Sequence, residues 1–264
     1  MNRYLGHLRR SAREGGFGMV ELIAAMTIML VGIMAVFALF NAGVIQIKRA
    51  ATRTTAAALA DAEMERFRAI LYERIGLDDD DVAAADSTYK ADSAYRADTS
   101  PTTSLSGAIS ATDLTIPVTS ATGFPTTAPY LIEVDAERIV VNGGAGTTSW
   151  SVRVVEERGW NGTTAASHAA GAGVTQKQRV DLPACVEPPT PPCTDRVPSK
   201  SVTGADGHPY RVDTYITWHT ITNSNSPQSS GRLVKLVTIV VRDDAAPHKE
   251  WARLSSAFDE STGV

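Results

Sequence analysis

The most uneven feature of the chain is a long apolar segment near its N-terminus. No charged residue occurs from Leu22 to Ile47, which reads LIAAMTIMLVGIMAVFALFNAGVIQI. A helix that crosses a bilayer needs about 20 mostly apolar residues, so this segment is long enough to span a membrane. A cleaved secretory signal has an apolar core of about 7 to 15 residues followed by a small-residue cleavage site, which does not fit this segment.

The helical pattern continues beyond this segment. Alanines are frequent after Lys48, and Gly76 is a natural stop for a helix. Between them an apolar stripe recurs at spacings of three and four residues, formed by Ala60, Met64, Phe67, Leu71 and Ile75. We therefore predict one spine helix over 17–76, with 17–47 as its transmembrane part.

The composition changes after this helix. Four consecutive acids, Asp78 to Asp81, lead into a near-repeat, ADSTYK followed by ADSAYR. An EF-hand loop counted from the first acid lacks the glycine at its sixth position and the glutamate at its twelfth. We interpret 77–103 as a solvated linker with a short local duplication.

Short runs of Val, Ile and Thr separated by glycine, proline and asparagine follow, as is typical of small antiparallel strands. The expected strands are Leu114–Val118, Tyr130–Val134, Arg138–Val141 and Ser149–Val155. The stretches GAISATDLTIPVTSATGFP, VDAERIVV and RGWNGTTAASHAAGAGV are similar to small β modules of phage tail and bacterial surface proteins. This resemblance implies an inserted small all-β module over 104–177.

The last part of the chain, 178–264, contains three further strand signals. Apolar and polar residues alternate from Tyr210 to Trp218, which predicts a half-buried strand. Leu233–Val241 is apolar on both faces and suits the centre of a sheet. Trp251–Phe258 is expected to be an edge strand. Together these signals predict an antiparallel sheet.

The charge of the chain argues against nucleic acid as a partner and says little about the orientation of the apolar segment in a membrane. The formal net charge of −4 over 264 residues gives no global electrostatic case for binding nucleic acid. Four arginines and one acid, Glu14, precede the apolar segment and favour a cytoplasmic N-terminus. Lys48, Arg49 and Arg53 follow the segment, so this rule alone barely decides the orientation. The long polar remainder suits an oxidising compartment outside the cytoplasm.

The two cysteines are too few for a four-cysteine zinc site and lie close together in sequence. Cys185 and Cys193 enclose the proline-rich loop VEPPTPP. A redox-active pair of cysteines would normally be separated by two residues at the start of a helix, and this pair meets neither condition. In an exported protein the simplest prediction is a structural disulfide.

Glu21 is a carboxylate at the edge of the apolar segment. An acid at the centre of a membrane helix costs about 2.5 to 3.5 kcal/mol, and less near an end, so it usually has a partner or a function. Two interpretations stay open on this residue alone. It is either an interfacial acid that stays hydrated or a residue that meets a cation.

The residues around Glu21 resemble a known signal. A basic leader, the string GGFGMVEL from Gly15 to Leu22 and the uninterrupted apolar helix together resemble the N-termini of type IV prepilins and type II secretion pseudopilins. The resemblance implies that a prepilin peptidase removes a leader over 1–16, cutting between Gly16 and Phe17, and that the new N-terminus is methylated. Glu21 would then neutralise the Phe17 amine of a neighbouring subunit.

The same resemblance implies a fold and a cellular location. It implies an α+β, pilin-like fold in which a long N-terminal helix packs on a C-terminal antiparallel sheet. The chain would sit in the inner membrane as a single-pass protein with its C-terminal domain outside, and then enter an extracellular pilus or a periplasmic pseudopilus. Its partners would be the peptidase, other pilin subunits, the inner-membrane assembly platform and, before assembly, membrane lipid.

Three functional readings remain open. No proline precedes Pro101, whereas many major pilins carry one inside the apolar helix, which favours a minor pilin or a pseudopilin. The third reading is a membrane-anchored adhesin that uses the inserted β module. Mass analysis of the N-terminus separates the adhesin from the other two, which share their processing.

Other candidate chemistry is sparse. Arg158, Trp160 and Asn161 form either an aromatic and polar binding spot or one satisfied turn. His168 has no second ligand at a metal-binding spacing, so we expect no metal. The remaining histidines are scattered, and no HExxH, GxSxG or phosphate-loop motif occurs. We therefore expect neither catalysis nor a cofactor.

Overall fold

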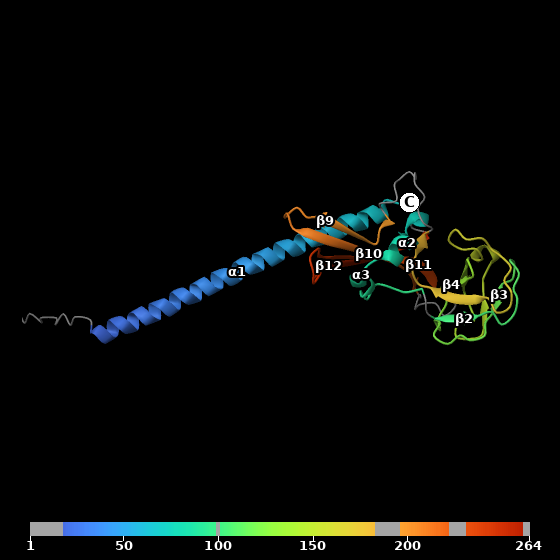
Figure 1. The fold of residues 1–264 in the computed structure, drawn as a ribbon, viewed down its shortest axis with the longest axis horizontal. Helices are drawn as coiled ribbons and strands as arrows, with labels where there is room; N and C mark the ends of the chain where they lie inside the picture. The colour runs from blue at the N-terminus through green and yellow to red at the C-terminus, as the bar shows by residue number, and fades with distance from the viewer. Residues whose placement is uncertain (1–17, 99–100, 183–195, 222–230, 261–264) are drawn as a thin grey trace, which may run out of the picture. The chain divides into compact units, whose positions relative to one another are not determined.

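The computed structural model describes residues 18–98, 101–182, 196–221 and 231–260 (Figure 1). These residues form two compact units that divide between Ala51 and Thr52. One helix, α1 (Met19–Arg68), contributes to both units. An α+β fold with a long apolar N-terminal helix and antiparallel sheets is therefore confirmed.

The predicted helix over 17–76 is too long at its C-terminal end. α1 stops at Arg68, Leu71 is extended, and a short 3₁₀ turn, η1 (Tyr72–Arg74), follows. The apolar stripe is interrupted at the same place, because the Leu71 side chain is 53% exposed while Ile75 is buried. The break turns the chain so that Ile75 enters the core, which a continuous helix would not allow.

The second unit is built on a four-stranded antiparallel sheet. Its strands are β9 (Ser199–Thr203), β10 (Pro209–Ile221), β11 (Arg232–Asp243) and β12 (Glu250–Phe258), in the order β12-β11-β10-β9. The doubly apolar segment is an inner strand, and the last strand is an edge, as predicted. The short strand β9 was not expected, since its sequence, SKSVT, has only one large apolar residue.

The C-terminal part of α1 covers one face of this sheet (Figure 1). The buried apolar residues of α1, Ala56, Ala60, Met64 and Phe67, follow helical spacing, and the alanines at two of these positions need little room beside the strands. They join strand residues such as Val212, Ile216 and Val237 in one core. Burying a side chain such as Phe67 contributes about 1.5–3 kcal/mol, so this packing holds the second half of α1 in place.

The opposite face of the sheet is covered by residues predicted to be a solvated linker. The linker contains two short helices, α2 (Asp79–Ala84) and α3 (Ser87–Lys90), which bury Val82 and Tyr89. The Tyr89 ring stacks on Tyr215 with centroids 4.4 Å apart. The prediction was wrong because most residues of this stretch are small or charged, while the few apolar ones lie at the positions that reach the sheet.

The near-repeat places three aspartates, six residues apart, opposite basic side chains. Asp86 pairs with Arg211, and Asp92 pairs with both Arg242 and Arg253. Asp98, the aspartate of the third Ala-Asp pair, pairs with Arg179 and Lys177. The repeat therefore works as a series of carboxylate contacts that fastens this segment along the sheet.

These contacts change the burial of β10. The strand was expected to be half-buried, yet Arg211, Asp213 and Thr214 are all under 9% exposed. The Asp213 carboxylate is fully buried and accepts hydrogen bonds from Arg211 Nε at 2.7 Å and Arg242 Nε at 3.2 Å. A buried carboxylate needs such partners, because an unpaired one costs several kcal/mol.

The inserted segment forms its own sheets. Four strands pair antiparallel in the order β2-β7-β4-β5, and β3 pairs with β6. A separate core lies between them, with Trp150 and Ile132 at its centre. The bounds are β2 (Thr102–Ser104), β3 (Thr115–Pro117), β4 (Tyr130–Val134), β5 (Glu137–Val141), β6 (Ser149–Ser151) and β7 (Gly173–Lys177), with a 3₁₀ turn, η2, at Val155–Glu157.

The predicted strands in this segment were found at shorter or shifted bounds. Tyr130–Val134 is reproduced as β4, while the strand expected over Ser149–Val155 ends at Ser151 and is followed by η2. A two-residue parallel pair joins β1 (Leu77–Asp78) to β8 (Asp181–Leu182), where the chain enters and leaves this segment.

We predict that the aspartates of the near-repeat stabilise the fold. Burial disfavours the charged form of Asp92, but the bonds from Arg253 and the charge of Arg242 hold the pKa of Asp92 below its usual range. Asp92→Ala removes a buried carboxylate that both arginines contact, leaving Arg242 with Asp213 and Arg253 with Glu250, and should lower the free energy of unfolding by about 2–3 kcal/mol. Chemical denaturation of the full chain in detergent micelles measures this loss.

The matched control is Asp61→Ala, which removes an exposed acid of α1. Its effect should stay within about 0.5 kcal/mol of zero. Equal losses for the two variants would show that the repeat is no more than a linker.

A second prediction concerns Lys235, which is fully buried on β11. Its ammonium donates hydrogen bonds to the carbonyl oxygens of Tyr72 and Ile75, each at 2.8 Å. Burial lowers the pKa of Lys235 to about 8, although the carboxylates of Glu73 and Glu260 oppose this shift. Above pH 8 the folded chain then holds fewer protons than the unfolded chain, so the free energy of unfolding should rise with pH up to the ordinary lysine range.

The test compares the wild type with Lys235→Met from pH 7 to about 9.5, below the ordinary tyrosine range. The wild type should gain stability relative to the variant as pH rises. The control Lys90→Met removes an exposed lysine and should keep the wild-type slope. Parallel curves for the wild type and Lys235→Met would contradict the prediction.

Candidate functional site in the N-terminal helix

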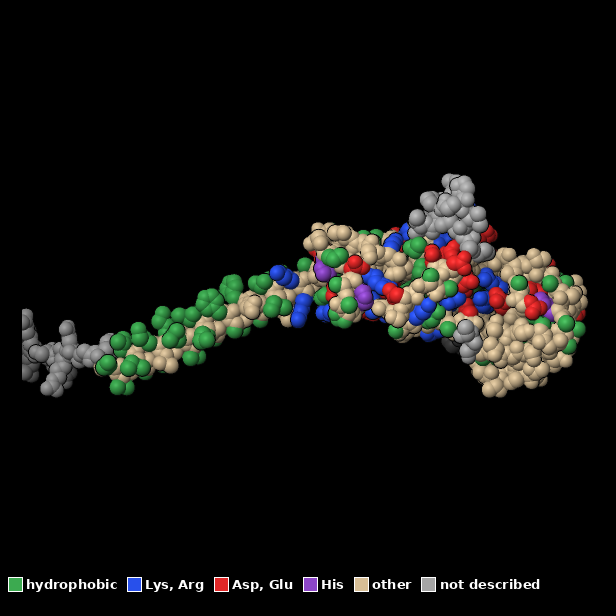
Figure 2. All heavy atoms as spheres, viewed as in Figure 1, with side chains coloured by type: hydrophobic (Ala, Val, Ile, Leu, Met, Phe, Trp, Pro, Cys, Tyr) green, Lys and Arg blue, Asp and Glu red, His purple; other side chains and the backbone are tan. Residues whose placement is uncertain are grey.

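The first unit presents a long apolar surface between Glu21 and Lys48. Every residue of α1 from Met19 to Ala51 is exposed, and green apolar side chains cover this part of the helix in Figure 2. Leu39 and Phe40, for example, are each 73% exposed. The most apolar stretch has a mean hydropathy of 2.7, and within the described residues α1 is the helix long and apolar enough to cross a membrane.

The sequence explains why this segment is a helix without tertiary support. Leucine, methionine and alanine have high helix propensity, and no proline interrupts them. Gly32 and Gly43 cost about 1 kcal/mol each relative to alanine, yet the helix continues through both. The hydroxyl of Thr27 donates to the carbonyl oxygen of Ile23 at 2.8 Å, so this polar side chain is satisfied within the helix.

Glu21 lies in the first turn of α1. The carbonyl of Gly18 accepts hydrogen bonds from the backbone N–H groups of Glu21 and Leu22, at 2.9 and 3.1 Å, which marks the start of the helix. A carboxylate near a helix N-terminus gains typically 0.3–1 kcal/mol from the helix dipole. This gain is smaller than the cost of placing an acid deep in a bilayer.

No cation of the described apolar helix can reach Glu21. Its carboxylate forms no ion pair or hydrogen bond within the described residues, and the next charged residue along the helix is Lys48. At 1.5 Å per residue, Lys48 lies about 40 Å further along the axis. A cation for this carboxylate must therefore come from the start of the chain or from another molecule.

Most of the other predicted site residues lie outside the described part of the chain. Gly16 and Phe17, the predicted processing positions, are in this group. So are Cys185 and Cys193, and their disulfide stays a prediction. Of the residues predicted for processing, assembly and the disulfide, the structure places Glu21.

The predicted binding spot around Trp160 does not assemble as expected. The guanidinium of Arg158 is buried and makes a two-point contact with the Glu137 carboxylate, at 2.7 and 2.9 Å. Asn161 has a positive φ of 54° and lies in a tight turn. Arg158 fits the alternative of a satisfied turn, whereas the side-chain amide nitrogen of Asn161 is buried with no hydrogen-bond partner among the described residues. Trp160 lines a cleft with a different set of residues.

His168 is part of the same buried cluster. Its ring nitrogens face Asp135 and Glu137, at 2.7 and 2.8 Å. Hydrogen bonds from Arg158 and His168 hold the pKa of Glu137 below its usual range, against the effect of burial. The cluster ties the turn after η2 to β5, and within the described residues no group of three metal-ligating side chains is arranged to hold a metal ion.

A second buried charge cluster joins the inserted segment to the rest of the unit. Lys177 of β7 lies 3.4 Å from Asp98 and 3.6 Å from Asp181, and Arg138 of β5 donates to the carbonyl oxygen of Asp181 at 3.0 Å. Burial and the neighbouring Asp98 raise the pKa of Asp181 to about 6. Sequence reasoning missed this cluster because its members are far apart in the chain.

Comparison of the chain with protein-family models, curated proteins and solved structures gave no match. Within the described residues, the feature that bears on function is the apolar half of α1 with its one acid, Glu21, and the sequence around it.

Proposed function

We propose that the chain is a structural subunit of a type IV pilus-like filament, of the minor pilin or pseudopilin kind. The observation that carries this proposal is one carboxylate, Glu21, in the first turn of a helix whose next charged residue is Lys48. The GGFGMVEL string that surrounds it supports the same function.

Processing would supply the missing cation. If the leader is cut between Gly16 and Phe17, the new amine lies four residues before Glu21. When apolar helices bundle, both charges leave water, and each is costly unless it meets the other. Pairing the Phe17 amine of one subunit with Glu21 of its neighbour satisfies both and sets the register between subunits.

The two halves of α1 would then have separate tasks. The exposed apolar half holds the chain in the inner membrane before assembly and packs against other subunits afterwards. The half beyond Ala56 is buried against the sheet and carries the folded domain on the outer side of the membrane. The proposed partners are the prepilin peptidase, the assembly platform and other subunits.

An anchored monomer explains Glu21 less well. A helix that only tethers a domain has no use for an acid at this position, and it would leave the carboxylate without a cation. A pilus and a secretion pseudopilus make the same use of Glu21, so the proposal covers both.

We predict that Glu21→Ala blocks filament assembly and leaves membrane insertion intact. The substitution removes a charge from an apolar helix, so insertion should be unchanged or better, while a neighbour's amine loses its partner. Incorporation into sheared, purified filaments should fall by at least about tenfold. Immunoblots of membrane and filament fractions measure both quantities.

Glu65→Ala is the matched control, since it removes an exposed acid from the same helix outside the apolar half. It should enter filaments at the wild-type level. If Glu21→Ala does so as well, the carboxylate has no role in assembly and the proposal fails.

A further inference from the structure

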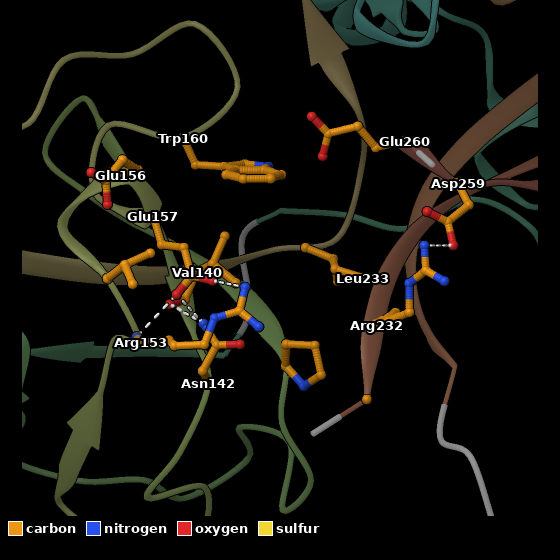
Figure 3. A pocket seen from close by; sticks show the side chains of 13 residues that line it. Val140, Asn142, Arg153, Glu156, Glu157, Trp160, Arg232, Leu233, Asp259 and Glu260 are labelled. Atoms are coloured by element: carbon orange, nitrogen blue, oxygen red, sulfur yellow. Dashed lines mark hydrogen bonds and ion pairs between the residues drawn. The ribbon is translucent and has the colours of Figure 1, made fainter. Parts of the chain in front are cut away.

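A cleft in the second unit lies between the inserted segment and the C-terminal sheet. Its volume is about 540 Å³, within the usual range for ligand sites. Residues of both parts line it, including Val140, Trp160, Leu233 and Glu260. In Figure 3 the Trp160 ring reaches into the space between Val140 and Leu233 on one side and Glu260 on the other. We call this space the Trp160 cleft.

Direct contacts hold the walls of the Trp160 cleft. The hydroxyl of Thr220 on β10 donates to the carbonyl oxygen of Pro129, a lining residue, at 2.5 Å. On the side of the inserted segment, the buried carboxylate of Glu157 accepts from Asn142 and from Arg153, the latter at 2.7 Å. The cleft is therefore built from side chains whose own positions are fixed.

The two guanidinium charges of the cleft are each matched by a carboxylate of the lining. Arg153 is paired with Glu157, and Arg232 is paired with Asp259. The other two carboxylates of the lining have no such cation among the described residues. The carboxylates of Glu156 and Glu260 form no ion pair or hydrogen bond with any residue that the structure describes.

The apolar residues of the cleft set a second requirement for a ligand. The indole of Trp160 offers its ring face, and Val140 and Leu233 line the same space. The face of an indole attracts cations, and the attraction grows when the cation loses water. A ligand that fits both features has an apolar stem and a cationic head.

We propose that the Trp160 cleft binds an ammonium or guanidinium group carried on an apolar stem, as in a lysine or arginine side chain or a free alkyl amine. Such heads are cationic donors, which suit a lining that carries two carboxylates beyond those paired with Arg153 and Arg232. The head lies near the Glu260 carboxylate, Glu156 adds to the negative charge of the lining, and the stem packs on Trp160. A neutral sugar gains nothing from this excess of negative charge.

The test uses the full chain in detergent micelles, labelled with 5-fluorotryptophan and observed by ¹⁹F NMR. The Trp160 resonance is assigned by its loss in Trp160→Phe. Acetyl-lysine methylamide should shift it saturably, with a dissociation constant on the order of 1 mM, as expected for so small a ligand. Acetyl-norleucine methylamide has the same stem without the ammonium and should bind at least about fivefold more weakly.

The carboxylates are tested by the double variant Glu156→Gln and Glu260→Gln. It keeps the shape of both side chains and should weaken acetyl-lysine methylamide about tenfold, whereas the control Glu65→Gln should not. Unchanged Trp150 and Trp251 resonances show that the variants are folded. Putrescine compared with acetyl-lysine methylamide identifies the source, a free amine or a protein side chain.

The proposal is overturned if the norleucine analogue binds as tightly as the lysine analogue, or if methyl mannoside shifts Trp160 while the amines do not. The absence of any shift with all amines at tens of millimolar also overturns it. None of these outcomes affects the proposed filament function, which depends on Glu21 and not on this cleft.

Discussion

The helix α1 lies in two different environments, and the rest of the molecule depends on how its sequence fits both. From Met19 to Ala51 the apolar side chains of α1 pack against nothing in the described part of the chain, whereas from Ala56 to Phe67 one stripe is buried against a sheet. Apolar surface on this scale requires lipid or other helices. The first half is therefore a candidate membrane span, and the second half connects it to the folded domain.

Each face of the C-terminal sheet is covered by a different kind of contact, and only the apolar contact with α1 could be predicted from the sequence. The periodic stripe of α1 indicated the apolar contact, because helical spacing is local information. The other face depends on aspartates of the near-repeat that meet Arg211, Arg242 and Arg179, residues distant in the chain. An acidic and alanine-rich composition is typical of a solvated linker. Only the basic residues that pair with these aspartates show that the segment packs on the sheet.

The two candidate sites differ in the same respect: one could be predicted from the sequence and the other could not. Glu21 could be identified from the sequence because the feature that makes it unusual, a charge beside a long apolar segment, is continuous in the chain. The Trp160 cleft could not, since Glu260 and Glu156 come from separate parts of the chain and the expected partner Arg158 turned inward to Glu137. Lys235 was missed too, since nothing in LVKLVTIVV shows that its lysine meets two helix-end carbonyls.

In the proposed function, trimming of the chain creates the cation that Glu21 requires. Mass spectrometry of the N-terminal peptide, from protein isolated from the membrane and filament fractions of its host, shows whether this happens. We expect a peptide that begins at methylated Phe17. A chain in both fractions that still carries the residues before Phe17 would contradict it.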